Sequence, residues 1–339
     1  MQAFDPHDAH LNLLRDAPRR LAFDPKRDFQ EWRQEVNAKF SELVGRLPEP
    51  CPLSLRCEYE REHEEFVERR IVFASEANVD VPAHLLIPRA VALPVPVVIC
   101  LQGHSTGMHI SLGRPKYPGD EESIKGDRDF ALQAVRQGFA ALAIEQRCFG
   151  ERKDNRPAEV RHFTNVCQHS TMVALLLGRT MVGERVWDVS RAIDALGEFE
   201  DVDATRIACM GNSGGGTITY YAACLEPRIS AAMPSCSVCT YRDSIGSIDH
   251  CADNYVPGVL QYFDMADLAG LIAPRPLVVV AGREDPIFPI RGVEEAFDTI
   301  SRIYLAADAP DTCTLVVGEG GHRFYAAEAW PVFRKVTGW

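Results

Sequence analysis

A serine in a glycine-rich turn is the residue of this sequence best suited to covalent chemistry. Ser213 lies within Gly-Asn-Ser-Gly-Gly, a G-x-S-x-G pattern placed between an apolar run and the start of an expected helix. Glycines at Gly211 and Gly215 remove the side chains that would collide in such a sharp turn, so the serine is held on a strained backbone with its hydroxyl exposed. The pattern predicts a nucleophile elbow; the alternative is a glycine-rich loop with an incidental serine.

A serine hydroxyl needs a base to take its proton and an acid to orient that base. Asp285 follows a strongly apolar expected strand, and His322 follows the last expected strand after two glycines. Serine, acid and histidine therefore occur in that chain order, each in a loop at the end of a strand. We predict that Ser213 is the nucleophile, His322 the base and Asp285 the acid.

Other carboxylates compete with the predicted acid. Glu284 directly precedes Asp285, and an aspartate before proline is also a common turn residue. Asp188, Asp264 and Asp267 lie outside the expected strand-end loops, so helix capping or surface charge explains them adequately. They are weaker candidates for this reason.

Two backbone N–H groups are expected to stabilise the oxyanion formed when the serine attacks a carbonyl. The amide of Gly214 lies at the positive end of the helix that follows the elbow. The second donor should come from the loop after the first parallel strand, where Gly103 and His104 lie, and the amide of His104 is our candidate. A substrate contact by the His104 side chain is the alternative.

The elements that must position these residues alternate between strands and helices. Short apolar runs, typical of strands buried on both faces, occur at 97–101, 139–144, 206–212, 228–234, 276–281 and 314–317. Helical patterns occur at 127–137, within 171–198 as two consecutive helices, at 294–303 and from about 325 to 335. An antiparallel hairpin is expected within 57–88. This alternation predicts an α/β fold with a mostly parallel sheet covered by helices on both faces.

The N-terminal segment has a different pattern from the rest of the chain. Apolar side chains recur three or four residues apart before Pro48, which predicts an amphipathic helix; they are Phe29, Trp32, Val36, Phe40 and Val44. We therefore expect a helical leader at 1–50 and a catalytic domain at 51–339. Within that domain, the mixed segment 235–273 is a candidate lid or subunit contact.

Composition limits the partners. The net charge of −12 opposes nucleic-acid binding. The sequence shows neither a long apolar run nor a signal-peptide profile, so we expect a cytoplasmic protein without a membrane partner.

Several of the eleven cysteines fall in apolar segments, as reduced thiols do. A metal cluster of Cys236, Cys239, His250 and Cys251 is a weak alternative to reduced thiols in a loop. No metal and no cofactor are expected.

Five motifs, in this order, resemble the α/β-hydrolase superfamily, and most of all its acetyl xylan esterase and dienelactone hydrolase-like branch: LQGHSTG, IEQRCFGER, GNSGGG, GREDPIFP and GGHRF. The resemblance runs from about Glu68 to the C-terminus. It implies the same triad and oxyanion hole, and an esterase that removes a small acyl group such as acetyl from a sugar or another polar alcohol. Gln102 replaces a histidine of many relatives, and 147–150 reads RCFG where Arg-Gly-x-Gly is usual. A dienelactone hydrolase proper would carry cysteine at position 213.

Two rival functions remain. A peptidase of the prolyl oligopeptidase type shares the serine elbow, but those enzymes usually carry a large extra domain, and only a short segment precedes the first parallel strand here. A non-catalytic binding protein on a hydrolase scaffold is the rival from another class. The expected partner is a small-molecule ester, and the chain is a candidate homo-oligomer.

Overall fold

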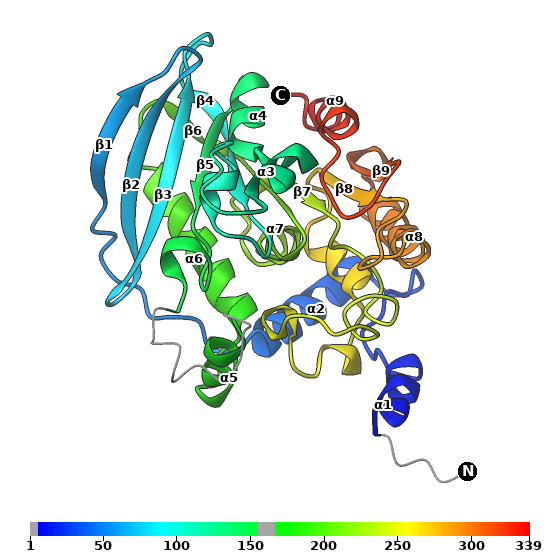
Figure 1. Ribbon diagram of the computed structural model, residues 1–339. Coiled ribbons are helices and arrows are strands. Elements are labelled where there is room, and N and C mark those ends of the chain that lie inside the picture. The colour runs from blue at the N-terminus through cyan, green and yellow to red at the C-terminus, as the bar shows by residue number, and fades with distance from the viewer. Residues whose placement is uncertain (1–5, 155–166) are drawn as a thin grey trace.

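The computed structural model describes residues 6–154 and 167–339, and within them nine strands form one twisted sheet (Figure 1). The strands follow one another across the sheet in the order β1-β2-β3-β5-β4-β6-β7-β8-β9. Their bounds are β1 Arg56–Glu62, β2 Phe66–Glu76, β3 Val79–Pro88, β4 Val95–Leu101, β5 Ala140–Ile144, β6 Val202–Asn212, β7 Ile229–Ser235, β8 Leu277–Gly282 and β9 Cys313–Gly318. All six predicted parallel strands are present.

The sheet has an antiparallel part and a parallel part. Strands β1, β2, β3 and β5 pair antiparallel, whereas β5, β4, β6, β7, β8 and β9 pair parallel. The predicted hairpin is β2 and β3, in which Ile71 pairs with Ala83. Strand β1 was not predicted, because its sequence RCEYERE is charged and almost entirely exposed. The prediction of a mostly parallel sheet is confirmed.

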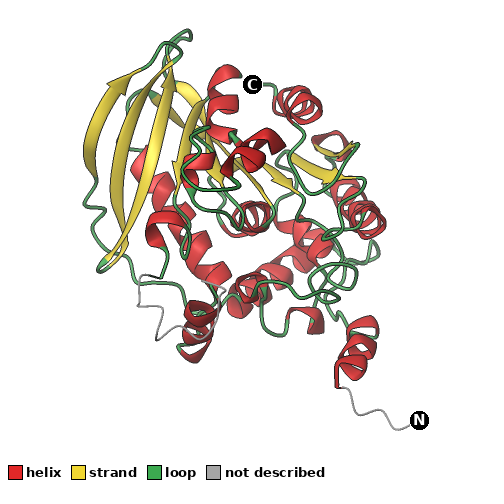
Figure 2. Cartoon of the chain, viewed as in Figure 1, coloured by secondary structure: helices red, strands yellow, loops and turns green. Residues whose placement is uncertain are grey.

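Helices cover both faces of the sheet (Figure 2). Alternate residues of β4 show the two layers: Val97 and Ile99 pack with α2, α6, α7 and α8, while Val98 and Cys100 pack with α4 and α9. The helix bounds are α1 Pro6–Arg15, α2 Phe29–Leu43, α3 Asp120–Ser123, α4 Phe130–Arg136, α5 Gln168–Leu176, α6 Met181–Leu196, α7 Gly214–Leu225, α8 Ile290–Ala306 and α9 Ala326–Thr337. None of the described helices is long and apolar enough to cross a membrane.

The predicted leader helix is α2, and it is part of the main core. Asp28 caps its N-terminus by accepting a hydrogen bond from the Glu31 amide. Trp32, Val36 and Phe40, on one face of the helix, are completely buried in the same apolar cluster as the sheet. The leader thus closes the core on the side of α7 and α8.

The segment 235–273 forms turns and short 3₁₀ helices. Its last helical stretch, Met265–Leu271, is buried and lies beside α2, α7 and α8. Asp264 caps this stretch by accepting a hydrogen bond from the Met265 amide, and Asp267 accepts one from the Asp264 amide. These two aspartates therefore have the capping role expected of them.

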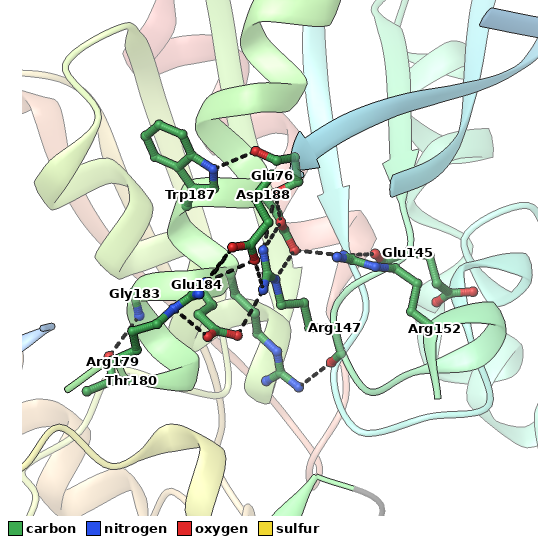
Figure 3. A network of polar contacts seen from close by, with 12 residues as sticks. Glu76, Glu145, Arg147, Arg152, Arg179, Thr180, Gly183, Glu184, Trp187 and Asp188 are labelled. Atoms are coloured by element: carbon green, nitrogen blue, oxygen red, sulfur yellow. Dashed lines mark hydrogen bonds and ion pairs between the residues drawn. The ribbon is translucent and has the colours of Figure 1, made fainter. Parts of the chain in front are cut away.

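A buried ion-pair network joins the antiparallel and parallel parts of the sheet (Figure 3). The Arg147 guanidinium donates to Glu76 at the end of β2 and to Glu184 and Asp188 on α6, at 2.7, 2.9 and 3.0 Å. Arg152 donates to the same Asp188 at 2.7 Å. Burial alone would raise the pKa of Asp188, but the two guanidiniums outweigh it and lower that pKa to about 2. Asp188, one of the weaker candidate acids in the sequence, therefore has a structural role as the shared partner of these two guanidiniums.

We expect Asp188→Asn to lower the free energy of unfolding by about 3–5 kcal/mol, because it leaves two buried guanidiniums without their shared counter-charge. Asp194→Asn on the same helix is the matched control. Asp194 pairs with Arg191 and Arg228 near the surface, where such pairs contribute about 0.2–1 kcal/mol. Urea unfolding measures both variants, and equal losses would contradict the assignment.

The stabilisation by Asp188 should also depend on pH. Its pKa is about 2 in the folded protein and about 3.9 in an unfolded chain, so its contribution is fully present above about pH 5 and is lost as the pH falls toward 2. We expect the difference in unfolding free energy between wild type and Asp188→Asn to shrink by about 2 kcal/mol over that range. A difference that stays constant in urea unfolding down to about pH 2 would contradict this.

Candidate active site

Ser213 occupies a strained turn between β6 and α7. Its backbone has φ 58° and ψ −128°, a conformation that non-glycine residues rarely adopt. The Ser213 amide donates to the carbonyl oxygen of Ser235 at 2.9 Å, and the Ser213 carbonyl accepts from the Thr217 amide at 2.8 Å. The turn that the sequence predicts at this position is thus present, and it ends directly in a helix N-terminus.

The two elbow glycines let the turn pack against the end of β4. A Cβ atom added to Gly215 would lie 2.1 Å from the carbonyl oxygen of Leu101, and one added to Gly211 would lie 2.5 Å from the same oxygen. Real Cβ atoms do not approach a carbonyl oxygen so closely. Packing therefore requires glycine at both positions.

The loop after β4 lies directly against the nucleophile. A Cβ atom on Gly103 would lie 2.6 Å from the Asn212 carbonyl oxygen and 2.9 Å from the Ser213 Cβ. A Cβ atom on Gly214 would lie 3.1 Å from the His104 Nδ1. The structure thus brings together the two residues whose amides we predict to form the oxyanion hole.

Asp285 and His322 form a hydrogen-bonded pair at the ends of β8 and β9. His322 Nδ1 lies 2.7 Å from the Asp285 carboxylate, which also accepts hydrogen bonds from the Ile287 and Phe288 amides at 2.8 and 3.2 Å. Burial would raise the pKa of Asp285, but the bond to His322 and these two amides lower it below its ordinary value. The carboxylate is therefore charged and can orient the imidazole. Glu284, the competing acid, is exposed.

Among the described residues, no hydrogen bond joins the Ser213 hydroxyl to His322. Catalytic hydrogen bonds are often long without substrate and tighten only in the complex, so this does not decide the role of either residue. With Nδ1 bound to Asp285, the imidazole has Nε2 left for a serine proton. The His322 ring is held in place by stacking on Phe288, with ring centres 5.9 Å apart.

A polar cavity of about 290 Å³ opens beside His322. Arg128 lines it and donates to the His322 carbonyl oxygen at 2.9 Å, and Arg323 lines it while pairing with Asp127 at 2.7 Å. The helix predicted from Asp127 begins only at Phe130, because Asp127 has a φ of 57°. Arg128 was expected inside this helix, so its place beside His322 could not be predicted from the sequence.

The imidazole of His104 lies beside Gly214 and also contacts a buried carboxylate. Its Nε2 lies 3.1 Å from Asp253, a fully buried carboxylate that also pairs with Arg185 at 2.8 Å. Burial would lower the pKa of His104, but the bond to Asp253 raises it to about 9. Neither Asp253 nor Arg185 was identified from the sequence, since neither follows a parallel strand.

The four residues of the weak metal alternative do not converge. The Cys236 thiol lies close to Asp285 and His322, and the Cys239 thiol faces the Pro289 carbonyl oxygen. Cys251 instead lies with His104 and Asp253. The grouping considered in the sequence is therefore wrong for these described residues.

Comparisons with known proteins show the family and the fold of the chain. The model of a family described as the Abhydrolase family matches residues 10–319. The "Putative hydrolase YtaP" of Bacillus subtilis is 27% identical over 293 residues, which is 86% of this chain and 94% of YtaP. The chain also shares its fold with a structure titled a "putative acetyl xylan esterase" from Bacteroides fragilis, with a TM-score of 0.74 and 17% identity over 97% of this chain and 84% of the other. A glucuronoyl esterase from Solibacter usitatus gives a TM-score of 0.70 and 17% identity, covering 95% and 96%.

We expect Gly103→Ala to slow the labelling of Ser213 by a fluorophosphonate about a hundredfold, because the new methyl group forces the loop away from the nucleophile. Gly197→Ala, at the end of α6, is the control; the atom nearest to the new methyl group would be a carbonyl oxygen of its own helix at 3.3 Å. Circular dichroism should show both variants folded. Equal labelling rates would contradict the close approach of Gly103 to Ser213.

Proposed function

Because the chain belongs to the Abhydrolase family, we propose that it is a serine esterase whose nucleophile is Ser213. One observation carries the proposal: a strained serine lies against the Gly103–His104 loop, while a charged Asp285 holds the imidazole of His322 at neighbouring strand ends. The relatives and structural neighbours are named as hydrolases and esterases, which supports a carboxylesterase.

The reaction we propose has two steps. The Ser213 oxygen attacks the ester carbonyl carbon while His322 Nε2 takes its proton, and the alcohol leaves with that proton as the acyl-enzyme forms. A water molecule then attacks the acyl-enzyme, with His322 again as base. Asp285 stabilises the imidazolium throughout, and the amides of His104 and Gly214 hold the oxyanion. These groups are sufficient for both steps, so the proposed mechanism needs no cofactor.

We further propose a small acyl group such as acetyl, bound to a sugar or another polar alcohol. The cavity beside His322 is small for a ligand site, since such pockets measure about 300–1,000 Å³. Its lining is polar and cationic, which favours a polar partner over a long aliphatic chain. The nine cysteines other than Cys167 and Cys251 form no disulfide, which supports the cytoplasmic location expected from the sequence.

A second candidate is the ester of an acidic sugar. Arg128 carries no ion pair with the described carboxylates, although it lines the cavity beside the proposed base. A cation that forms no ion pair with a described carboxylate at this place favours a substrate with an anionic or strongly polar group near the cleaved bond. The glucuronoyl esterase among the structural neighbours is consistent with this candidate.

The test is a panel of acetyl, butyryl and longer acyl esters beside methyl esters of uronic acids, assayed as kcat/KM on the purified chain. We expect acetyl esters of polar alcohols to be cleaved best, and Ser213→Ala to abolish turnover. Asp285→Asn should lower kcat by about 10⁴-fold, since the imidazole then loses its orientation and its counter-charge. A preference for uronate methyl esters would replace the first candidate with the second.

The controls separate the remaining rivals. Glu284→Gln, which neighbours Asp285 but is exposed, should leave kcat unchanged. Efficient cleavage of aminoacyl amides with inert esters would favour a peptidase instead. A folded wild type that neither turns over any ester nor reacts with a fluorophosphonate would favour a binding protein.

A further inference from the structure

We propose that the chain holds one zinc ion between His104, Cys167, Cys251 and Asp253, next to the oxyanion loop. The four residues come from separate parts of the chain: the loop after β4, the start of α5 and the segment 235–273. The proposed zinc site is separate from the proposed esterase activity, and its test does not depend on whether the chain cleaves esters.

The ligand atoms already converge. One imidazole nitrogen, two thiol sulfurs and one carboxylate oxygen from these residues all lie within 4.8 Å of one another. In a tetrahedral zinc site, bonds of about 2.0–2.3 Å place neighbouring ligand atoms roughly 3.3–3.8 Å apart. Small side-chain adjustments would therefore close the cluster around one ion.

The surroundings contain polar atoms that lack partners. The second carboxylate oxygen of Asp253, Oδ1, is buried without a hydrogen bond, and so is the amide oxygen of the adjacent Asn254. Buried polar atoms are nearly always satisfied in folded proteins, by protein groups, water or ions. The Asp253 Oδ2 atom already contacts His104 and Arg185, and an ion bound to the cluster would give the Oδ1 atom a partner as well.

The chemistry of the donors selects zinc among common cations. Two thiolates with an imidazole and a carboxylate are the soft and borderline ligands that zinc takes, whereas magnesium and calcium take oxygen ligands. Arg185 is fully buried and pairs with Asp253 at 2.8 Å. Its positive charge and that of the ion together balance two thiolates and one carboxylate, so the filled site is neutral. Arg185 also fixes the orientation of a ligand, as outer partners of zinc sites do.

The second convergent group in the structure is a poorer site. Cys236, Asp285 and His322 also place their donor atoms within 4.8 Å of one another. His322 Nδ1 and Asp285 are already satisfied by each other at 2.7 Å, and Asp285 accepts two further amides. It offers three ligands where the first group offers four.

Four protein ligands leave no open position, which is the pattern of a structural zinc site and not of a catalytic one. The ion would tie His104, whose amide is the proposed oxyanion donor, to the segment that contains Cys251 and Asp253. It would replace the proton on the His104 imidazole, and binding would therefore release protons. His104 is a positioning residue in this arrangement.

The test uses the full chain and cobalt as a spectroscopic probe. Protein stripped of metal by a chelator is titrated with Co²⁺, and we expect one equivalent to give thiolate-to-cobalt charge-transfer absorption with tetrahedral ligand-field bands. One equivalent of Zn²⁺ should remove them. Cys251→Ser and Cys167→Ser should each weaken zinc binding about 10- to 100-fold or more, since even outer-shell changes cost that much.

Matched controls are Cys57→Ser and Cys313→Ser, which remove thiols outside the cluster and should keep the wild-type spectrum. A wild type without charge-transfer absorption overturns the proposal, even if the cluster variants fail to fold. Loss of the spectrum in Cys236→Ser with retention in Cys251→Ser overturns it in favour of the second group. A Cys167–Cys251 disulfide in the purified protein, seen as a mass lower by two hydrogens, overturns it as well.

Discussion

The packing of the elbow against the end of β4 is the contact on which the site depends. β4 and β6 are neighbouring parallel strands, with Leu101 paired to Gly211, so they end at the same edge of the sheet. The Leu101 carbonyl oxygen then fills the space where side chains at Gly211 and Gly215 would lie. This approach brings Gly103 next to Ser213, the proposed nucleophile. The strain in Ser213, of order 1–3 kcal/mol, is small beside the burial of the surrounding sheet.

The same edge supplies the other two members of the proposed triad. β8 and β9 pair in register from Leu277 and Cys313 to Gly282 and Gly318, so the loops that follow them start side by side. Asp285 and His322 meet there although 37 residues separate them in the chain. Ligand sites of open α/β sheets lie at the carboxyl ends of the strands for this reason. The parallel pairing of the sheet, and not any local motif, makes the acid and the histidine neighbours.

Features governed by local pattern could be predicted, and features governed by distant pairing could not. Apolar runs buried on both faces revealed the parallel strands, and strand-end loops indicated Ser213, Asp285 and His322. Strand β1 is charged and exposed, so no apolar alternation marked it. The pairing of His104 with Asp253 spans 149 residues and ends in a short 3₁₀ helix without periodicity. The residues that neighbour either partner in the chain carry no sequence pattern that would predict such a pair.

His104 couples the reaction centre to the rest of the molecule. Its backbone amide is the proposed second oxyanion donor, its ring lies beside Gly214, and its imidazole contacts Asp253, which in turn pairs with Arg185 on α6. Oxyanion donors accelerate a reaction only if they already point at the oxyanion position before charge develops there. The loop that carries them then does not have to rearrange during the step. The contacts of His104 with Asp253 in segment 235–273, and of Asp253 with Arg185 on α6, would hold such a donor in place. Segment 235–273, which is a candidate lid from its sequence alone, thus contacts the proposed site through the side chain of His104.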